Sequence, residues 1–316
     1  MILNILLLIL GFIFLIKGAD IFVDGSSSTA QNFKVPKMLI GLTIVAFGTS
    51  APEFAVSMSA LAHHNSDMVL GNVIGSCILN ILLILGVAAL IKPIKLKDST
   101  IKKELPLTIL ISALLVVLML DVSLAGDPIN RITRLDSIVM LLFFTVFIYY
   151  LVTLAKSKKE KDDEKAPFGL GKSIIFIILG LACIIIGSDL VVNNASSIAK
   201  TLGLSERVIS LTIVAFGTSL PELVTTIVSS KKGEQDLLVG NIIGSNIFNI
   251  CVVLGLPILI YGTIPTGAFN NLDLIMLVAS AIMLLVFSKT NKTITKSNGI
   301  IMLVAFAIYY TLVFIV

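Results

Sequence analysis

The chain has 316 residues, of which 57% are hydrophobic and 13% are charged. A soluble domain carries about 25% charged residues, so this composition excludes a soluble domain and is typical of a polytopic membrane protein. The net charge of +4 does not indicate a nucleic-acid partner, because the basic residues lie in short loops between apolar runs.

Hydrophobic runs of about twenty residues, the length that crosses a bilayer core, recur along the whole chain. Runs this long and apolar predict helices rather than barrel strands, because a helix satisfies its own backbone in lipid. We therefore expect an all-α polytopic membrane protein with ten transmembrane helices. The expected spans are residues 2–24, 35–61, 69–91, 104–125, 135–155, 171–193, 206–230, 237–262, 269–288 and 298–316.

The distribution of Lys and Arg predicts the orientation. With the N-terminus outside, eighteen of the 23 basic residues lie in inside loops, four in outside loops, and Lys17 within the first span. Such a bias places both termini outside the cell. The expected location is the cell membrane, crossed many times.

One stretch of sequence occurs twice. Residues 41–55 read GLTIVAFGTSAPEFA and residues 210–224 read SLTIVAFGTSLPELV, and they agree at eleven of fifteen positions at an offset of 169. At the same offset, GNVIGSCILNI (71–81) matches GNIIGSNIFNI (240–250) at eight of eleven positions. Each half holds five expected spans, an odd number, so the halves enter the membrane in opposite directions. Inverted repeats of this kind are common in secondary transporters.

The repeat sets the expected domain organisation. Residues 1–155 form the first repeat of five helices, and residues 172–316 form the second, inverted repeat. Residues 156–171 between them contain the charged run SKKEKDDEK and are predicted to be a short cytoplasmic linker.

A proline precedes a glutamate in each copy of the repeated stretch. Pro52 has no N–H, so we expect a break in the helix that Gly48 tolerates and that frees carbonyl groups near Ala46. Thr49 and Ser50 lie four and three residues before Glu53, on the same helix face. This groups a carboxylate, two hydroxyls and carbonyls, which are oxygen ligands of the kind that Ca²⁺ binds.

The third span of each half carries polar residues spaced by four. They are Asn72, Ser76 and Asn80 in the first half and Asn241, Ser245 and Asn249 in the second. The accompanying glycines, Gly71, Gly75, Gly240 and Gly244, predict close approach of neighbouring helices.

The glutamates require a positive partner, because a carboxylate inside a bilayer costs at least about 2.5–3.5 kcal/mol. No Lys or Arg lies in the interior of the four spans that carry these motifs. The partner is then a proton or a metal ion, and two carboxylates balance one Ca²⁺. The only histidines, His63 and His64, lie in a predicted outside loop, so a transition-metal site is not indicated. The alternative is that a kink of this kind serves only helix packing, which two inverted copies argue against.

Other polar or small residues receive structural interpretations. Asp20 and Asp189 lie near the expected ends of the first and sixth spans, where capping or an interface contact is expected. The fourth, fifth, ninth and tenth spans carry almost no polar residue inside and are expected to be scaffold. Glycines of the first and sixth spans (Gly11, Gly18, Gly180 and Gly187) would let these helices slide over the core. Cys77, Cys183 and Cys251 are interpreted as packing residues.

The paired GTS-x-PE segments, each followed by G-N-x-I-G-S-x-I-x-N, resemble the two alpha repeats of the Ca²⁺/cation antiporter superfamily, and most closely those of prokaryotic Na⁺/Ca²⁺ exchangers. The resemblance implies a ten-helix fold with central ion sites in which Glu53 and Glu222 are shared metal ligands. It further implies hydroxyl or carbonyl ligands from Thr49, Ser50, Thr218 and Ser219, carbonyls from Ala46 and Ala215, hydroxyls from Ser76 and Ser245, and amides from Asn80 and Asn249. Some relatives carry Asp where this chain has Asn249, and its absence favours a K⁺-independent exchanger.

The sequence thus predicts a secondary active antiporter, not an enzyme, that exchanges Na⁺ for Ca²⁺ by alternating access. The resemblance implies about three Na⁺ per Ca²⁺ and hence electrogenic exchange. Ca²⁺ and Na⁺ are the substrates, no cofactor is expected, and the protein is expected to be a monomer in the lipid bilayer. A Ca²⁺/H⁺ antiporter remains the alternative, as does a cation channel, which would also need acidic residues and freed carbonyls. A membrane hydrolase is disfavoured because no HExxH or GxSxG motif occurs.

Overall fold

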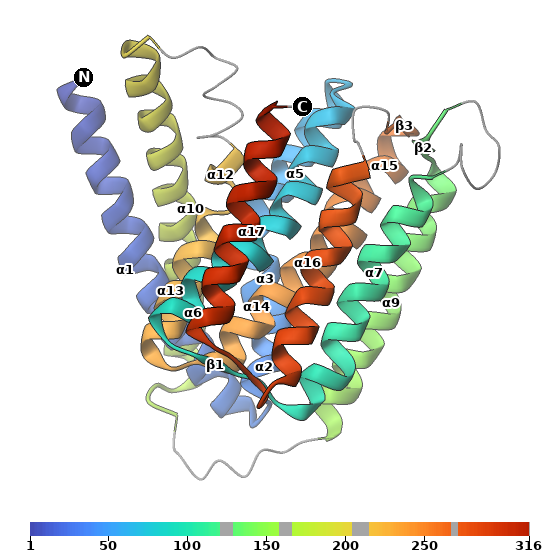
Figure 1. Ribbon diagram of the computed structural model, residues 1–316. Helices are drawn as coiled ribbons and strands as arrows, with labels where there is room; N and C mark the ends of the chain where they lie inside the picture. The colour runs from blue at the N-terminus through green and yellow to red at the C-terminus, as the bar shows by residue number, and fades with distance from the viewer. Residues whose placement is uncertain (121–128, 158–165, 204–214, 267–270, 316) are drawn as a thin grey trace. The chain divides into compact units, whose positions relative to one another are not determined.

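A computed structural model describes residues 1–120, 129–157, 166–203, 215–266 and 271–315, which are almost entirely helical (Figure 1). Contacts divide the chain into two compact units, residues 1–52 with 157–241 and residues 53–156 with 242–316. Each unit therefore combines segments from both halves of the sequence. Half of the expected linker (158–165), Arg207 and the first five residues of the second repeated stretch (210–214) lie outside the described residues.

The first unit is built on two long helices. Its elements are α1 (Ile2–Phe33), α2 (Lys37–Ile40), the π-helix η1 (Gly41–Val45), α3 (Ala46–Thr49), α10 (Leu170–Thr201), α12 (Ala215–Gly217), α13 (Leu220–Lys232) and the first part of α14 (Gln235–Phe248). Helices α1 and α10 lie side by side (Figure 1).

Glycines bring α1 and α10 into backbone contact. A Cβ atom on Gly18 would lie 2.7 Å from Cβ of Cys183 and 2.9 Å from the carbonyl oxygen of Gly180. A Cβ atom on Gly11 would lie 2.9 Å from the carbonyl oxygen of Gly187. The residue numbers of α10 fall as those of α1 rise, so the two helices, which begin the two halves, run antiparallel.

The expected ends of the first and sixth spans are wrong. α1 continues nine residues beyond residue 24, and α10 continues eight residues beyond residue 193. The prediction ended both spans where apolar residues give way to polar ones, but Ser and Thr hydroxyls do not stop a helix that has found packing partners. α1 ends instead at the left-handed Lys34 (φ 54°), two residues before Pro36. Asp20 consequently lies in the middle of α1 and caps neither end.

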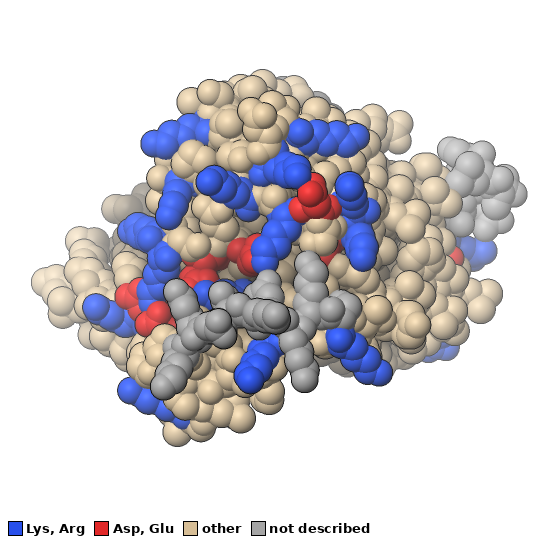
Figure 2. Space-filling view, turned by 90° about the horizontal axis from the view of Figure 1, so that it is seen from below, with Lys and Arg blue, Asp and Glu red and all other residues tan. Residues whose placement is uncertain are grey.

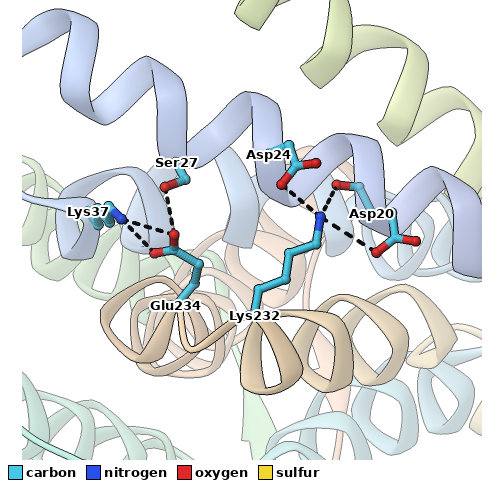
Figure 3. A network of polar contacts seen from close by, with 6 residues as sticks. All are labelled: Asp20, Asp24, Ser27, Lys37, Lys232 and Glu234. Atoms are coloured by element: carbon cyan, nitrogen blue, oxygen red, sulfur yellow. Dashed lines mark hydrogen bonds and ion pairs between the residues drawn. The ribbon is translucent and has the colours of Figure 1, made fainter. Parts of the chain in front are cut away.

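An ion-pair network joins α1 to α13 and to the turn after it (Figure 3). Nζ of Lys232 lies 2.7 Å from Oδ1 of Asp24 and 3.5 Å from Oδ1 of Asp20. Glu234 accepts hydrogen bonds of 2.9 Å from Lys37 and from Ser27. Asp20 therefore makes an interface contact, which is one of the two roles expected for it.

The second unit contains the remaining helices and all four described strands. Its elements are α4 (Ala51–Ala62, from residue 53), α5 (Ser66–Leu79), η2 (Asn80–Leu85), α6 (Gly86–Ile91), β1 (Ile94–Lys95), η3 (Thr100–Glu104), α7 (Leu105–Leu118), β2 (Arg131–Ile132), α9 (Arg134–Ser157), the rest of α14, η5 (Asn249–Leu254), α15 (Gly255–Tyr261), β3 (Ile264–Pro265), α16 (Asn271–Lys289), β4 (Thr293–Ile294) and α17 (Lys296–Ile315). β1 pairs antiparallel with β4, and β2 with β3, so each two-stranded sheet joins one strand from each half.

The helices expected to be scaffold are more polar than predicted. Glu104, at the start of the fourth expected span, is 1% exposed and accepts a hydrogen bond from Tyr150 on α9. Asp273 on α16 accepts a hydrogen bond of 2.8 Å from Tyr309 on α17. Both carboxylates lie close to the end of an apolar run, and sequence alone could not show that a phenol on the neighbouring helix covers them.

Seven helices in the described part of the chain are long and apolar enough to cross a membrane, or eight if a helix pair bent by 44° counts as one. The bent pair is residues 37–49 with 51–62. The fourth expected span contains α7, which has 14 residues, and both this span and the seventh lie partly outside the described residues. Lys and Arg side chains are spread over the face drawn in Figure 2, with a few Asp and Glu among them.

Candidate cation site

The helix break predicted at Pro52 is present in the structure. α3 ends at Thr49 and α4 begins at Ala51, so Pro52 occupies the first turn of the new helix, where its missing N–H costs nothing. Ser50 between the two helices has φ −83° and ψ 7°.

The second copy breaks in the same manner. α12 ends at Gly217, α13 begins at Leu220, and Pro221 lies in the first turn of α13. Ser219, the repeat partner of Ser50, has φ −90° and ψ 4°. The matching sequences therefore produce matching backbone turns.

The glycines at the two breaks serve close packing rather than strain. Neither Gly48 nor Gly217 is among the described residues with positive φ, so the strain-tolerant role expected for Gly48 is wrong. A Cβ atom on Gly48 would lie 3.1 Å from Cδ2 of Leu181, and one on Gly217 would overlap Cγ2 of Val192. Both neighbours are on α10, which therefore packs closely against each break.

Both glutamates lie in the first turn of the helix that follows a break. Glu53 belongs to the first turn of α4 and Glu222 to that of α13, and both side chains are 0% exposed. The N-terminal end of a helix carries partial positive charge from its backbone N–H groups, which stabilises a nearby carboxylate. Each break thus places a buried acid where the backbone already favours its charged form.

In the first unit, polar contacts link the two copies of the motif. Ser50 Oγ donates a hydrogen bond of 2.9 Å to Oε1 of Glu222. Thr49 Oγ1 donates one of 3.1 Å to Oδ1 of Asn241, whose Nδ2 lies 3.4 Å from Oγ1 of Thr226. All five side chains are buried.

In the second unit, Asn72 stabilises the first turn of α4, which carries Glu53, through two hydrogen bonds. Its Nδ2 donates hydrogen bonds of 2.9 Å to the carbonyl oxygen of Glu53 and 3.0 Å to Oγ of Ser57. Ser76, one turn further along α5, is 5% exposed, and its repeat partner Ser245 on α14 is 0% exposed.

Asn80 and Asn249, the last polar residues of the two stripes, each open a π-helix, η2 and η5. Asn80 Nδ2 donates a hydrogen bond of 2.9 Å to Oδ1 of Asn246, while its own Oδ1 has no hydrogen-bond partner. Asn249 is 0% exposed, and neither polar atom of its side chain has a hydrogen-bond partner. A buried amide left in this state costs about 1–3 kcal/mol, so both side chains have capacity for a ligand.

The expected carbonyl ligands are less free than predicted. The carbonyl oxygen of Ala46 accepts hydrogen bonds from the N–H of Ser50 at 3.0 Å and from Oγ1 of Thr49 at 3.4 Å. It therefore differs from the unbonded carbonyl expected at the kink. Ala215 begins α12, and Thr218 lies at the break that follows α12.

The two polar stripes differ in exposure. Gly71, Asn72 and Gly75 on α5 are half-buried, and a Cβ atom on Gly75 would meet no atom within 4 Å. Their repeat partners on α14 are buried, and a Cβ atom on Gly240 would lie 2.8 Å from the carbonyl oxygen of Met38. Close helix approach was thus predicted correctly at Gly240 and wrongly at Gly75, where the structure has open space.

Two further residues belong to the surroundings of these motifs and were missed in the sequence. Ser188 on α10 donates a hydrogen bond of 2.8 Å to the carbonyl oxygen of Gly217 at the second break. Asn246 is the hydrogen-bond partner of Asn80. Asn246 was detectable in principle, because it replaces Cys77 at one of the three mismatches between the two G-N-x-I-G-S segments.

The buried donors of the two motifs are carboxylate, hydroxyl and amide oxygens, some in the first unit and some in the second. Such donors suit hard cations, whereas imidazole and thiolate suit transition metals. Buried acids beside broken helices in a membrane protein indicate an ion-binding role.

Comparison with known proteins agrees with this chemistry. A family model described as sodium/calcium exchanger protein matches residues 3–153 and again residues 172–315. The chain is 40% identical to the putative antiporter CaxA of Alkalimonas amylolytica, with 97% of each chain covered. It is 31% identical to the sodium/calcium exchanger MaX1 of Methanosarcina acetivorans, with 98% of each chain covered.

A solved structure has a fold similar to that of this chain. The structure of the sodium-calcium exchanger NCX_Mj soaked with 2.5 mM Na⁺ and 1 mM Sr²⁺ matches with a TM-score of 0.86 and 33% identity, covering 98% of this chain and 97% of that one. The protein is accordingly a multi-pass α-helical membrane transporter and not an enzyme, and the chain belongs to the sodium/calcium exchanger protein family.

Proposed function

We propose that the protein is a secondary active antiporter that exchanges Na⁺ for Ca²⁺ by alternating access. The observation that carries this proposal is the pair of glutamates, Glu53 and Glu222, each 0% exposed in the first turn of a helix that follows a break. No Lys or Arg occurs in residues 38–91, 208–230 or 235–261, which include both glutamates. Ions that compete for the same carboxylates cannot be bound together, and this exclusion makes transport an exchange.

Both glutamates act as ligands of the transported ion in this proposal. Oxygen atoms of the neighbouring polar residues complete the ligand set, which is Thr49, Ser50, Ser76, Asn80, Thr218, Ser219, Ser245 and Asn249 with the carbonyls of Ala46 and Ala215. The buried amides of Asn80 and Asn249 support it, since each retains polar atoms without a hydrogen-bond partner. Two carboxylates neutralise one Ca²⁺, and amide and hydroxyl oxygens complete a shell of six to eight ligands.

Alternating access is supported by the unequal exposure of the two polar stripes. Asn72 on α5 is half-buried, whereas its repeat partner Asn241 is 1% exposed. Two stripes with nearly the same sequence therefore have different access, as expected if one approach is open while the other is closed. The glycines of α1 and α10 (Gly11, Gly18, Gly180 and Gly187) bring the two backbones into direct contact, and in this proposal the two helices slide along this contact when the roles exchange.

The proposal includes ten membrane spans arranged as two inverted repeats of five, residues 1–155 and 172–316, joined by a cytoplasmic linker at 156–171. It is supported by the family model, which matches once in each half, and by the antiparallel α1 and α10. The π-helices η2 and η5 begin at Asn80 and Asn249, 169 residues apart. Both termini outside the cell, location in the plasma membrane and a monomeric state are further parts of the proposal. Labelling of single cysteines placed at Ile2 and Gly169 by a membrane-impermeant reagent tests the orientation.

The deciding experiment is ⁴⁵Ca²⁺ uptake into proteoliposomes at fixed pH with Na⁺ inside and none outside. The proposal requires uptake that depends on the Na⁺ gradient. Uptake driven only by a proton gradient would identify a Ca²⁺/H⁺ antiporter, and Ca²⁺ current without a counter-ion would identify a channel. Electrogenic exchange of three Na⁺ for one Ca²⁺ moves one net positive charge outward during uptake, so a potential positive inside the vesicle should accelerate it. One charge crossing 100 mV corresponds to about 2.3 kcal/mol.

A further inference from the structure

A chain of hydrogen bonds between α5 and α14 ends on the side chain of Asn80. Asn246 Nδ2 donates a hydrogen bond of 3.2 Å to the carbonyl oxygen of Cys77. Asn246 Oδ1 accepts one of 2.9 Å from Nδ2 of Asn80. Asn80 and Asn246 are each 1% exposed, and Cys77 is 0% exposed, so water does not compete for these bonds.

The order of donors and acceptors in this chain is fixed by chemistry. A backbone carbonyl can only accept, so Asn246 must turn its NH₂ group toward Cys77. The oxygen of Asn246 then faces Asn80, so Asn80 must donate a hydrogen bond from its own NH₂ group. The one atom left over is Oδ1 of Asn80, which has no hydrogen-bond partner. A cation can be bound by this oxygen but is repelled by the NH₂ group.

The second half of the chain lacks this arrangement. Asn249 is the repeat partner of Asn80, and Cys77 is the repeat partner of Asn246, at the common offset of 169. The Cys77 thiol lies 3.8 Å from the carbonyl oxygen of Asn246, and neither polar atom of Asn249 has a hydrogen-bond partner. The amide of Asn80 is therefore held in one orientation, while that of Asn249 is not.

We propose that Asn246 is a positioning residue, which fixes the Asn80 amide with its oxygen directed to the transported cation. It does not itself bind the ion. This inference rests on the proposed function, in which Asn80 is a ligand. It adds that the two half-sites are unequal, because only one of the two amides is oriented before the ion arrives. An oriented ligand raises affinity, since no ordering is required on binding.

The test is a double-mutant cycle read by Ca²⁺ titration of the purified protein in Na⁺-free buffer. Asn246→Leu removes both hydrogen bonds at similar volume and is expected to weaken Ca²⁺ binding about tenfold. In an Asn80→Asp background the same change should alter the affinity less than about twofold, because the two oxygens of a carboxylate are equivalent and need no orientation. Cys77→Ala keeps the backbone carbonyl that orients Asn246 and should leave Ca²⁺ affinity unchanged.

The outcomes of this cycle test the positioning role of Asn246 separately from the proposed exchange function. Equal weakening by Asn246→Leu in both backgrounds would show a merely structural role and overturn the proposal, as would unchanged affinity in the parent background. If Asn246→Leu does not fold, Asn246→Ser gives the same comparison, because its shorter side chain cannot reach both partners. Failure of the proposed exchange would instead appear in the unmutated protein, as absence of Na⁺-driven Ca²⁺ uptake. Because the cycle measures binding, it can be completed whichever gradient drives transport.

Discussion

Ser50 donates a hydrogen bond of 2.9 Å to Glu222, which lies 172 residues later in the chain, and both side chains are buried. Ser50 belongs to the first copy of the repeated motif and Glu222 to the second. The two copies are therefore not independent sites, because a hydroxyl of one directly contacts the carboxylate of the other.

Replacing Ser50 by Ala is expected to raise the KM for Ca²⁺ about tenfold. The change removes a hydrogen bond to a charged group, which contributes about 1.5–3 kcal/mol, and also a proposed ion ligand. Ca²⁺ uptake measured over a range of Ca²⁺ concentrations gives the KM. Ser280→Ala is the matched control: Ser280 is equally buried, but it donates only to the carbonyl of Leu277 in its own helix, so uptake should be unchanged.

Replacing Glu53 or Glu222 by Gln is expected to abolish Ca²⁺ uptake without unfolding the protein. Gln preserves the size of the side chain and removes the charge that binds the cation. Thermal unfolding in detergent should show a midpoint no lower than that of the unmutated protein, because a buried charge has been removed. Glu104→Gln removes another buried carboxylate, one that is bonded to Tyr150, and should retain uptake. Retained uptake in both Glu53→Gln and Glu222→Gln would contradict the assigned site.

The helix breaks and their buried acids were predictable because their causes are local. Proline removes a backbone donor wherever it occurs, and the repeat offset by itself pairs Ser50 with Ser219 and Glu53 with Glu222. Contacts between halves were not predictable. Nothing in the sequence near Ser50 indicates that its partner is Glu222 rather than Glu53, which lies three residues away.

The predictions of helix ends and of glycine roles were wrong for a different reason. Hydropathy ends α1 near residue 24, but the polar residues that follow are stabilised by contacts such as Ser27 with Glu234, far away in sequence. The sequence suggests backbone strain at Gly48, whereas in the structure Leu181 on α10 packs tightly against it, 3.1 Å from where a Cβ atom would lie. A glycine in a sequence does not reveal which of its two properties, free φ or missing Cβ, is in use.

Acidic pH is expected to inhibit exchange, because a protonated glutamate has no charge with which to hold Ca²⁺. The initial rate of Na⁺-driven uptake should fall as pH is lowered from about 7.5 to about 5. An unchanged rate over this range would count against the glutamate site.

Asp98 provides a control for that pH profile. The hydrogen bond of 2.8 Å from Lys292 lowers the pKa of the exposed Asp98 carboxyl below its ordinary 3.8. A lowered pKa means that the stabilising contact is present above the unfolded pKa and is lost only as pH falls through the folded pKa. Asp98 therefore stays charged down to about pH 5, and Asp98→Asn should not alter the profile.

Replacing Gly18 by Ala is expected to lower the stability of the first unit. The added Cβ would lie 2.7 Å from Cβ of Cys183 and 3.0 Å from the backbone nitrogen of Ile184, so α1 and α10 must separate. Overpacking of this kind costs about 1–3 kcal/mol, which thermal unfolding in detergent would detect as a lower midpoint. Gly171→Ala, on α10 with no atom within 4 Å of the added Cβ, should show no loss.

Exchange is expected to proceed equally well with and without K⁺. Asn249 is neutral, so Glu53 and Glu222 are the only acids in the proposed ligand set, and their two charges are fully used by one Ca²⁺. A third acid at this position would leave one negative charge over, which a monovalent cation could neutralise. Na⁺-driven ⁴⁵Ca²⁺ uptake should therefore have the same rate when external K⁺ is replaced by choline. Asn249→Asp supplies the comparison: it should make the rate sensitive to K⁺ or to pH, since either K⁺ or a proton can balance the added charge. A rate that falls in choline for the unmutated protein would show that K⁺ is bound without that third acid.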